Sequence, residues 1–350
     1  MTAVRFENVS IVFGDDPDSA LPLMDEGMSR EEVMTATNQV LGVHDCNLEV
    51  ETGEILVLMG LSGSGKSTLL RAVNGLNDVQ RGRVQLRDGD QMVDVTGADA
   101  RTLRRLRLNV VAMVFQQFGL LPWRTVRENV GLGLELGRVP RAERNSRVNA
   151  QLGLVGLFDR ADAKVGELSG GMQQRVGLAR AFTTNAPVLL MDEPFSALDP
   201  LIRARLQEEL LELQATLKRT IIFVSHDLDE AFKIGDRIAI MEGGRIVQCG
   251  TPREIYSAPA TPYVADFVAH MNPLGVLSAK DLMRPANATQ YAATIGAEAT
   301  VVDVIERLGD DPVVGVVENG TVVGEINRES TLAALADPRG DSAGESQDLV

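Results

Sequence analysis

Residues 60–68 have the composition and spacing of a phosphate-binding loop, G-x-x-x-x-G-K-S followed by threonine. Glycines let such a loop curl until successive backbone N–H groups point at phosphate oxygens, and the helix that follows adds the positive end of its dipole. The lysine reaches the terminal phosphates and the next hydroxyl binds Mg²⁺. The sequence therefore predicts binding of a nucleoside triphosphate through Gly60, Ser62, Gly63, Ser64, Gly65, Lys66, Ser67 and Thr68.

An acidic pair, Asp192 and Glu193, follows the apolar run 188–191. Such a pair is common after a strand, but in a chain with a phosphate loop it predicts hydrolysis of the nucleotide. Asp192 is expected to hold Mg²⁺ together with Ser67, and Glu193 is expected to act as general base on the attacking water.

Short β-rich runs alternate with helical patterns from about residue 4 to residue 268, which predicts an α/β domain. The phosphate loop lies between a predicted strand and a helix ended by Gly75, which is the context it needs. Apolar residues at helical spacing indicate an amphipathic helix between 202 and 217. The predicted strands are 54–59, 110–115, 188–191 and 220–224, with a hairpin over 237–249.

A third glycine-containing motif comprises Ser169, Gly170, Gly171 and Met172, and it opens a predicted helix. With the two phosphate motifs it resembles the signature of the ABC ATPases. That resemblance covers residues 4 to about 268 and implies a RecA-like P-loop NTPase core with an antiparallel β subdomain and a helical subdomain. It also implies ATP and Mg²⁺ as cofactors, and a homodimer in which the signature contacts the ATP bound to the opposite subunit.

The same resemblance implies further roles. Gln116 matches a loop glutamine that senses Mg²⁺ and water, and His226 matches a switch histidine that contacts the γ-phosphate. For adenine, Phe13 is the preferred stacking partner, with Phe6 as the competing candidate. The motif that would cross the dimer interface comprises Ser196, Ala197, Leu198 and Asp199.

Composition narrows the function classes. The net charge of −15 argues against nucleic acid as a partner, because a phosphate backbone is bound by clustered lysine and arginine. No stretch reaches the roughly 20 apolar residues of a membrane helix. Two isolated cysteines, Cys46 and Cys249, and an N-terminus without a signal layout fit a cytosolic protein.

Three function classes stay open: a transporter motor, an ABC protein that acts on nucleic acid or ribosomes, and a non-catalytic regulatory module. The single acidic cassette favours an importer subunit at the cytoplasmic face of the membrane, held by two permease subunits that work with an extracytoplasmic solute-binding protein. The runs 60–76 and 192–207 resemble ATPases of glycine betaine, proline betaine and choline importers, and residues 115–124 favour the choline branch. The alternatives are an importer of another solute and a soluble ABC ATPase outside transport.

The sequence predicts three consecutive segments, the first of which contains two smaller parts. Residues 1–272 form the cassette, with a subfamily insert at 14–40 and the helical subdomain at about 117–180. Residues 273–336 resemble a single α+β cystathionine-β-synthase (CBS) repeat of β-α-β-β-α order, followed by a disordered tail at 337–350. This repeat is expected to expose an apolar sheet face to a second copy through Val314, Val316, Val322 and Ile326.

The segment from Gln116 to about Val130 is expected to dock a permease loop. It places several large apolar side chains in a run with little helical or strand periodicity. These side chains are Phe118, Leu120, Leu121 and Trp123.

Overall fold

The computed structural model describes residues 1–336 apart from 118, 197 and 270, and leaves out the side chains at 213, 217 and 273. The chain divides into two units, one of residues 1–226 and 234–247, the other of residues 227–233 and 248 onward. The predicted boundary at 272 and the tail at 337–350 stay predictions, the tail because it lies outside the described residues. Within that part of the chain no helix is long and apolar enough to cross a bilayer.

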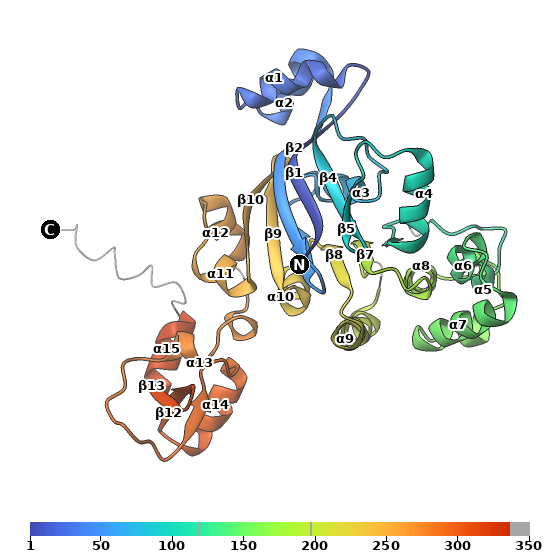
Figure 1. The fold of residues 1–350 in the computed structure, drawn as a ribbon. Helices are drawn as coiled ribbons and strands as arrows, with labels where there is room; N and C mark the ends of the chain where they lie inside the picture. Colours follow the sequence, from blue (N-terminus) through green and yellow to red (C-terminus); the bar gives the residue numbers. More distant parts are fainter. Residues whose placement is uncertain (118, 197, 270, 337–350) are drawn as a thin grey trace. The chain divides into compact units, whose positions relative to one another are not determined.

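The first unit contains two sheets (Figure 1). An antiparallel sheet has the order β2-β1-β4-β5 and a second sheet the order β10-β9-β3-β8-β7-β6. The strands of the first are β1 (Thr2–Phe13), β2 (Val40–Glu51), β4 (Arg81–Asp88) and β5 (Gln91–Asp94). Those of the second are β3 (Ile55–Met59), β6 (Val111–Val114), β7 (Val188–Asp192), β8 (Thr220–Val224), β9 (Arg237–Glu242) and β10 (Arg245–Gly250).

The second sheet forms the core because its central strands are continuous apolar runs. Every residue of β3, β7 and β8 is buried, as expected of parallel strands covered on both faces. All predicted strands are confirmed to within one residue at each end. The helices of this part are α3 (Lys66–Ala72), α4 (Ala100–Asn109) and α9 (Pro200–Leu217), whereas α10 (Leu228–Ile234) belongs to the second unit except for its last residue.

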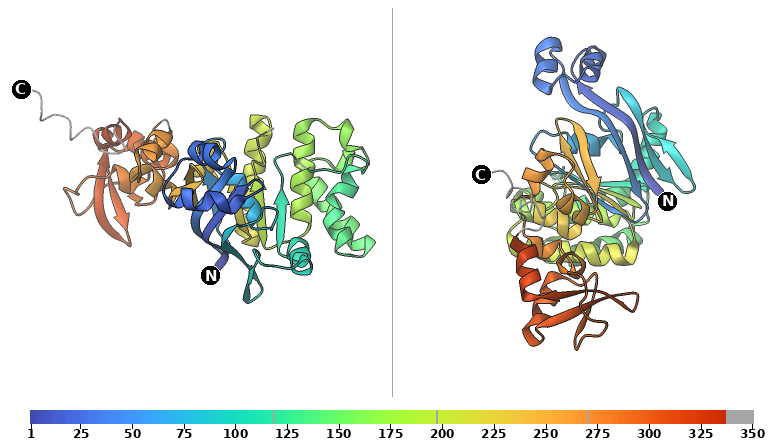
Figure 2. Two further views of the ribbon diagram at one scale, coloured as in Figure 1. Left: turned by 90° about the horizontal axis from the view of Figure 1, so that it is seen from above. Right: turned by 90° about the vertical axis from the view of Figure 1, so that its left-hand side faces the viewer.

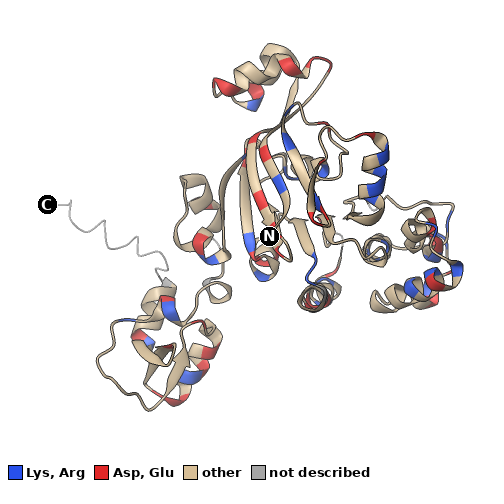
Figure 3. Cartoon of the chain, viewed as in Figure 1, with Lys and Arg blue, Asp and Glu red and all other residues tan. Residues whose placement is uncertain are grey.

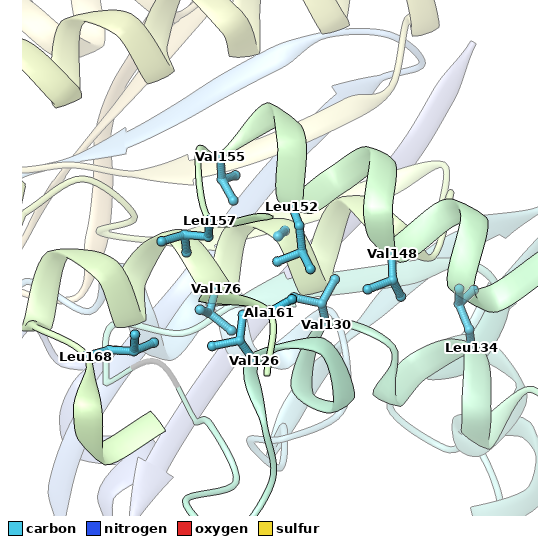
Figure 4. Close-up of a cluster of buried hydrophobic side chains, with 11 residues drawn as sticks. Val126, Val130, Leu134, Val148, Leu152, Val155, Leu157, Ala161, Leu168 and Val176 are labelled. Atoms are coloured by element: carbon cyan, nitrogen blue, oxygen red, sulfur yellow. The ribbon is translucent and has the colours of Figure 1, made fainter. Parts of the chain in front are cut away.

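The predicted helical subdomain has a small core of its own (Figure 4). Apolar residues of its helices, among them Val130, Leu152 and Val176, pack together. Its last helix also contacts β6 of the central sheet. The subdomain consists of α5 (Val126–Val130), α6 (Leu132–Leu136), α7 (Arg141–Leu154), the short 3-10 turns Phe158–Arg160 and Val165–Glu167, and α8 (Gly170–Thr183).

The insert connects the end of β1 to the start of β2 (Figure 2). It contains a 3-10 turn (Pro17–Ala20), α1 (Leu21–Asp25) and α2 (Arg30–Thr37). The predicted capping box of Ser29 and Glu32 is present at the start of α2. Met24 and Val33 of the insert are fully buried against Val12 and Leu41 of the sheet, so these helices pack firmly on the sheet.

In the second unit, the predicted β-α-β-β-α order of the C-terminal segment is confirmed. β12 pairs in parallel with β11 and antiparallel with β13. The resemblance to a CBS repeat stays a prediction. The elements are α11 (Pro252–Ser257), α12 (Pro262–Val268), a 3-10 turn (Pro273–Gly275), α13 (Ala279–Leu282), β11 (Thr294–Gly296), α14 (Val301–Asp310), β12 (Val313–Glu318), β13 (Thr321–Asn327) and α15 (Arg328–Ala336).

The prediction that this sheet exposes an apolar face to a second copy is wrong. Val314, Val316 and Ile326 are fully buried within the single chain, and Val322 is half-buried. The three helices α13, α14 and α15 contact β12 and β13 and cover that face themselves. The alternation of apolar residues therefore correctly predicted that this face is buried, but it did not predict that helices of the same chain cover it.

Glu325 ties the irregular segment after α13 to β13. It is buried, and its carboxylate accepts hydrogen bonds from the Tyr291 hydroxyl (2.6 Å), the Asn287 side-chain amide (2.9 Å) and Arg284 Nε (3.0 Å). These donors, the Tyr291 hydroxyl first, lower the pKa of Glu325 from 4.5 to about 2. The ring of Tyr291 also lies over Gly315, where a Cβ atom would approach it to 2.6 Å.

This arrangement predicts an acid-sensitive C-terminal sheet. Because the pKa of Glu325 is depressed in the folded state, its stabilisation is complete above pH 4.5 and is lost as the pH falls toward about 2. Glu325→Gln should weaken amide-exchange protection of β12 and β13 at pH 7 and flatten its decline between pH 5 and pH 3. Hydrogen exchange read by mass spectrometry measures both. Glu318→Gln, on the same sheet, is the control, and an unchanged acid response in Glu325→Gln would contradict the assignment.

Candidate active site

The chemistry-bearing residues meet at the carboxyl ends of three neighbouring parallel strands. β8 lies between β3 and β7, with the phosphate loop after β3, Asp192 at the end of β7 and His226 shortly after β8. In open α/β sheets, ligands bind in the crevice outside these strand ends. The strand order therefore brings together residues that lie far apart in the sequence.

The phosphate loop adopts the backbone that its glycines allow. Gly60, Gly63 and Gly65 all have positive φ angles, and Gly65 directly precedes the helix α3. The Lys66 ammonium curls back and donates to the carbonyl oxygens of Gly60 (2.8 Å) and Leu61 (2.9 Å). Burial lowers the pKa of Lys66, whereas the nearby Glu193 acts in the opposite direction. The loop thus holds a preformed cation at its centre.

Ser67 and Asp192 lie in direct contact. The Ser67 hydroxyl donates to Asp192 Oδ1 at 2.6 Å, and Arg71 Nη2 donates to Asp192 Oδ2 at 2.8 Å. The Asp192 side chain is fully buried. A hydroxyl beside a carboxylate is the hard-oxygen donor set that suits Mg²⁺, so these residues fit the predicted ion.

Glu193 has an uncommon backbone conformation with φ of 48°. Such a conformation costs on the order of 1 kcal/mol and often marks functional residues. It is held by a backbone bond to the Val224 carbonyl (3.1 Å) and by Gln174 Nε2, which donates to the Glu193 carbonyl at 3.3 Å. The Glu193 carboxylate then lies 3.3 Å from both His226 Nδ1 and Gln116 Nε2. The structure thus joins the three predicted catalytic residues.

A cavity of about 620 Å³ lies over these groups. Phe13 is 42% exposed and lines the cavity, whereas Phe6 is 2% exposed in the core of the sheet. Phe6 is therefore unsuited to stacking on adenine, and Phe13 remains the preferred candidate. The predicted residues that line the cavity are Phe13, Ser62, Gly63, Gly65, Lys66, Ser67, Thr68, Gln116, Glu193 and His226.

The signature residues lie outside this cavity. Ser169 caps α8, accepting a hydrogen bond from the Met172 backbone at 3.4 Å, and is exposed. Met172 is half-buried against the helical core, so its departure from the more usual glutamine leaves the start of α8 well packed. In the predicted interface loop, Asp199 caps α9, Ser196 is exposed and Leu198 is buried; Ala197 lies outside the described residues.

The sequence interpretation missed several residues in or beside the site, among them the following four. Arg71 could have been found, because it lies four residues after Ser67 on the same helical face. Gln174, 1% exposed, could have been found from its place in the signature helix. Gly42 and Arg30 also line the cavity, but their contacts are long-range and leave no local signal.

This fold and this set of strand-end residues define an ATP-binding cassette of the P-loop type. A family model for the ABC transporter matches residues 43–196. A solved dimeric ATP-binding cassette in a post-hydrolysis state, bound to ADP and phosphate, has a TM-score of 0.61 and 30% identity, over 71% of this chain and 99% of that chain.

Two relatives match nearly the whole chain. The glycine betaine/proline betaine transport system ATP-binding protein ProV of Salmonella typhimurium is 44% identical over 97% of this chain and 85% of its own length. The trimethylamine N-oxide transport system ATP-binding protein TmoW of Ruegeria pomeroyi is 43% identical over 95% of this chain and 96% of its own length. The chain therefore belongs to the ABC transporter family and is one of its ATP-binding subunits.

The geometry around Glu193 predicts that binding and hydrolysis can be separated. Glu193→Gln keeps the shape of the side chain but cannot accept a proton from water, so turnover should fall by about 10²-fold or more while ATP affinity is retained. Phosphate release and nucleotide titration measure the two effects. Lys66→Ala, which removes a charge from the phosphate loop, should weaken binding as well. Near-parent hydrolysis by Glu193→Gln would show that Glu193 is not the base.

Proposed function

We propose that this chain is the motor subunit of an importer for small quaternary amines of the glycine betaine type. The observation that supports this proposal is similarity along nearly the full chain to ATP-binding subunits that serve glycine betaine, proline betaine and trimethylamine N-oxide transport. An ATPase subunit powers transport without contacting the solute, so the narrower expectation of choline stays a prediction.

In the proposed mechanism, Phe13 stacks on the adenine while Lys66 and the backbone N–H groups of the loop bind the phosphates. Ser67, Asp192 and Gln116 would hold Mg²⁺, which supplies positive charge against the phosphate oxygens. In the structure the Ser67 hydroxyl and Arg71 already bind both oxygens of Asp192. These contacts fix the direction of its carboxylate before the nucleotide binds.

Glu193 then accepts a proton from the attacking water, and His226 positions the Glu193 carboxylate and reaches the γ-phosphate. The His226 ring is 63% exposed, whereas the Glu193 side chain is only 18% exposed. The base is thus sheltered, and the histidine faces the open side of the cavity. A second subunit approaching that side would exclude water from both groups.

We infer dimerisation because the two predicted phosphate-binding elements, the phosphate loop and the signature at the start of α8, do not meet within one chain. Ser169 and Gly171 are not among the residues lining the cavity of their own chain, so we propose that they reach the ATP of a second copy. The Ser169 end of α8 would then add N–H donors to the γ-phosphate. With ATP present, Glu193→Gln should accumulate as a dimer in size-exclusion chromatography, whereas Lys66→Ala should not.

We propose the segment after Gln116 as the docking surface for a permease loop. Two permease subunits would hold the ATPase subunits at the cytoplasmic face of the membrane, beside a solute-binding protein. Trp123 is 69% exposed. Its backbone is nevertheless fixed, because Lys164 donates to its carbonyl at 3.0 Å and the buried Asn129 bonds Leu121 on both backbone groups. A rigid loop with an exposed indole has the character of a binding hot spot.

The other apolar residues of that segment contribute less than the sequence predicted. Leu120 is half-buried and packs against the helical core, and Leu121 is also half-buried. Phe118 lies outside the described residues. The proposed docking surface therefore centres on Trp123.

Solute uptake tests the proposed function. The chain is co-expressed with the permease and solute-binding subunits of its transport system and reconstituted in proteoliposomes loaded with ATP. Radiolabelled glycine betaine, trimethylamine N-oxide and choline are then offered in turn. We expect accumulation of at least one of them, and its abolition by Glu193→Gln. Uptake of none of them, alongside uptake of an unrelated solute, would contradict the proposal.

Trp123→Ala tests the docking surface in the same vesicles. Removing the indole should reduce uptake by about tenfold or more while ATPase activity of the isolated chain stays within twofold, because Trp123 does not line the nucleotide cavity. Phe158→Ala is the matched control, since Phe158 is a 53% exposed aromatic of the same subdomain. Equal loss of uptake in both variants, or none in Trp123→Ala, would count against a docking role.

A further inference from the structure

Arg30, the first residue of α2, carries a guanidinium from the insert into the nucleotide cavity. The insert that carries it is anchored at two places. Met24 and Val33 are buried in the cluster against β1 and β2. Asp25 also bonds both Arg81, at 2.7 and 2.8 Å, and the buried His44, at 3.0 Å. The insert is thus a fixed platform for Arg30.

The guanidinium binds only neutral oxygens. One terminal nitrogen donates to the carbonyl of Gly63 in the phosphate loop, and the other donates to the carbonyl of Gly42 in β2. Arg30 Nε is buried without a partner. Across the described part of the chain, no carboxylate forms an ion pair with Arg30, although it is half-buried.

One guanidinium bridges these two carbonyl groups, so they lie close together at the edge of the proposed nucleotide site. A Cβ atom on Gly65 of the loop would approach the Gly42 carbonyl oxygen to 2.7 Å. Gly63 belongs to the phosphate loop. Gly42 lies beside the adenine platform, because a Cβ atom there would approach both the Phe13 ring and the Thr68 methyl group to 2.9 Å. Arg30 therefore lies where the base end of the cavity meets the phosphate end, next to the expected position of the ribose and the first phosphate.

We propose that Arg30 binds the phosphate chain of the nucleotide near its ribose end, which makes the insert a functional part of the ATP site. This inference rests on the proposed nucleotide site and adds a residue to it. A half-buried cation without a counter-charge is unfavourable, and a phosphate oxygen would supply that charge. The carbonyl groups of Gly63 and Gly42 keep the planar fork oriented toward it.

The electrostatic setting favours a contact to phosphate over one to the base. Burial lowers the pKa of the Arg30 guanidinium, so its charge has lost part of its hydration. A partly desolvated arginine gains more from an anion than an exposed one does. Arg30 should therefore increase the affinity for ATP and ADP but not for adenosine.

The test compares nucleotide affinities of full-length variants by displacement of a fluorescent ADP analogue. Arg30→Gln keeps hydrogen-bond donors for the two carbonyl groups but removes the charge. This variant should lower the affinity for ATP and for ADP by about tenfold, and the affinity for adenosine by less than twofold. Arg30→Lys keeps the charge and should retain most of the preference for ATP over adenosine.

Arg101→Gln provides the matched control, because Arg101 is an exposed arginine on the basic helix α4 (Figure 3) and does not line the cavity. It should leave all three affinities unchanged. The proposal would be overturned if Arg30→Gln lowered the affinities for ATP and adenosine equally and also lowered the melting temperature of the nucleotide-free protein. That result would show a purely structural role for Arg30. An unchanged ATP affinity would also overturn the proposal.

Two further measurements keep the outcomes distinct. Lys66→Ala in the same assay tests the nucleotide site itself: if it binds ATP as the parent does, the proposed function fails, whereas failure of Arg30→Gln alone removes only this inference. In the parent chain, ADP but not adenosine should slow amide exchange in α2. Equal protection by both ligands, or by neither, would overturn the contact even if Arg30→Gln did not fold.

Discussion

The pairing of β8 with both β3 and β7 is the constraint on which the site depends. Val224 is in register with Leu58 on one side and with Asp192 on the other. The first residues beyond the strand ends continue this alignment, because the Ser225 N–H donates to the Leu58 carbonyl and the Glu193 N–H to the Val224 carbonyl. A shift of one residue would turn the proposed base away from the phosphate loop.

This alignment assembles one side of the ATP site that we propose for a dimer. The cations and carboxylates that act on a phosphate gather at one sheet edge, while the Ser169 end of α8 projects from a subdomain with its own core. A helix start of this kind is an anion-binding element that lacks an anion within its own chain. In the proposed dimer, ATP bound between two copies would satisfy both elements at once, so the nucleotide itself would become part of the interface.

Local patterns predicted the strands and motifs because each depends on adjacent residues. Two strands could be predicted in this way: the buried run 55–59, which precedes the glycines of the phosphate loop, and the run 188–192, which ends in an acidic residue. The contacts of Gln174 with the Glu193 backbone and of Arg30 with Gly63 depend on tertiary packing, and neither has a periodic signal.

The same limit explains the wrong expectation for the C-terminal sheet. Alternating valines around Val314 and Val316 correctly indicate a buried face. The pattern does not say whether a helix of the same chain or a second copy covers that face. Val304 and Leu308 on α14 supply apolar partners within the unit. The short strands and helices of this C-terminal segment are therefore enough to close a small core.

The proposed contact from the insert would add a binding residue, Arg30, to the nucleotide site that forms at the ends of the parallel strands. The two anchors of the insert differ in kind: the Met24 cluster excludes water, whereas the Asp25 contacts are charged, and the bond to Arg81 holds the pKa of Asp25 well below its ordinary range. Together they fix α2 from outside the cavity, so the position of Arg30 does not depend on the nucleotide. A half-buried arginine that contacts only neutral carbonyl groups is energetically unfavourable until an anion binds beside it. The structure has an anion site beside it, in the loop that already holds Lys66.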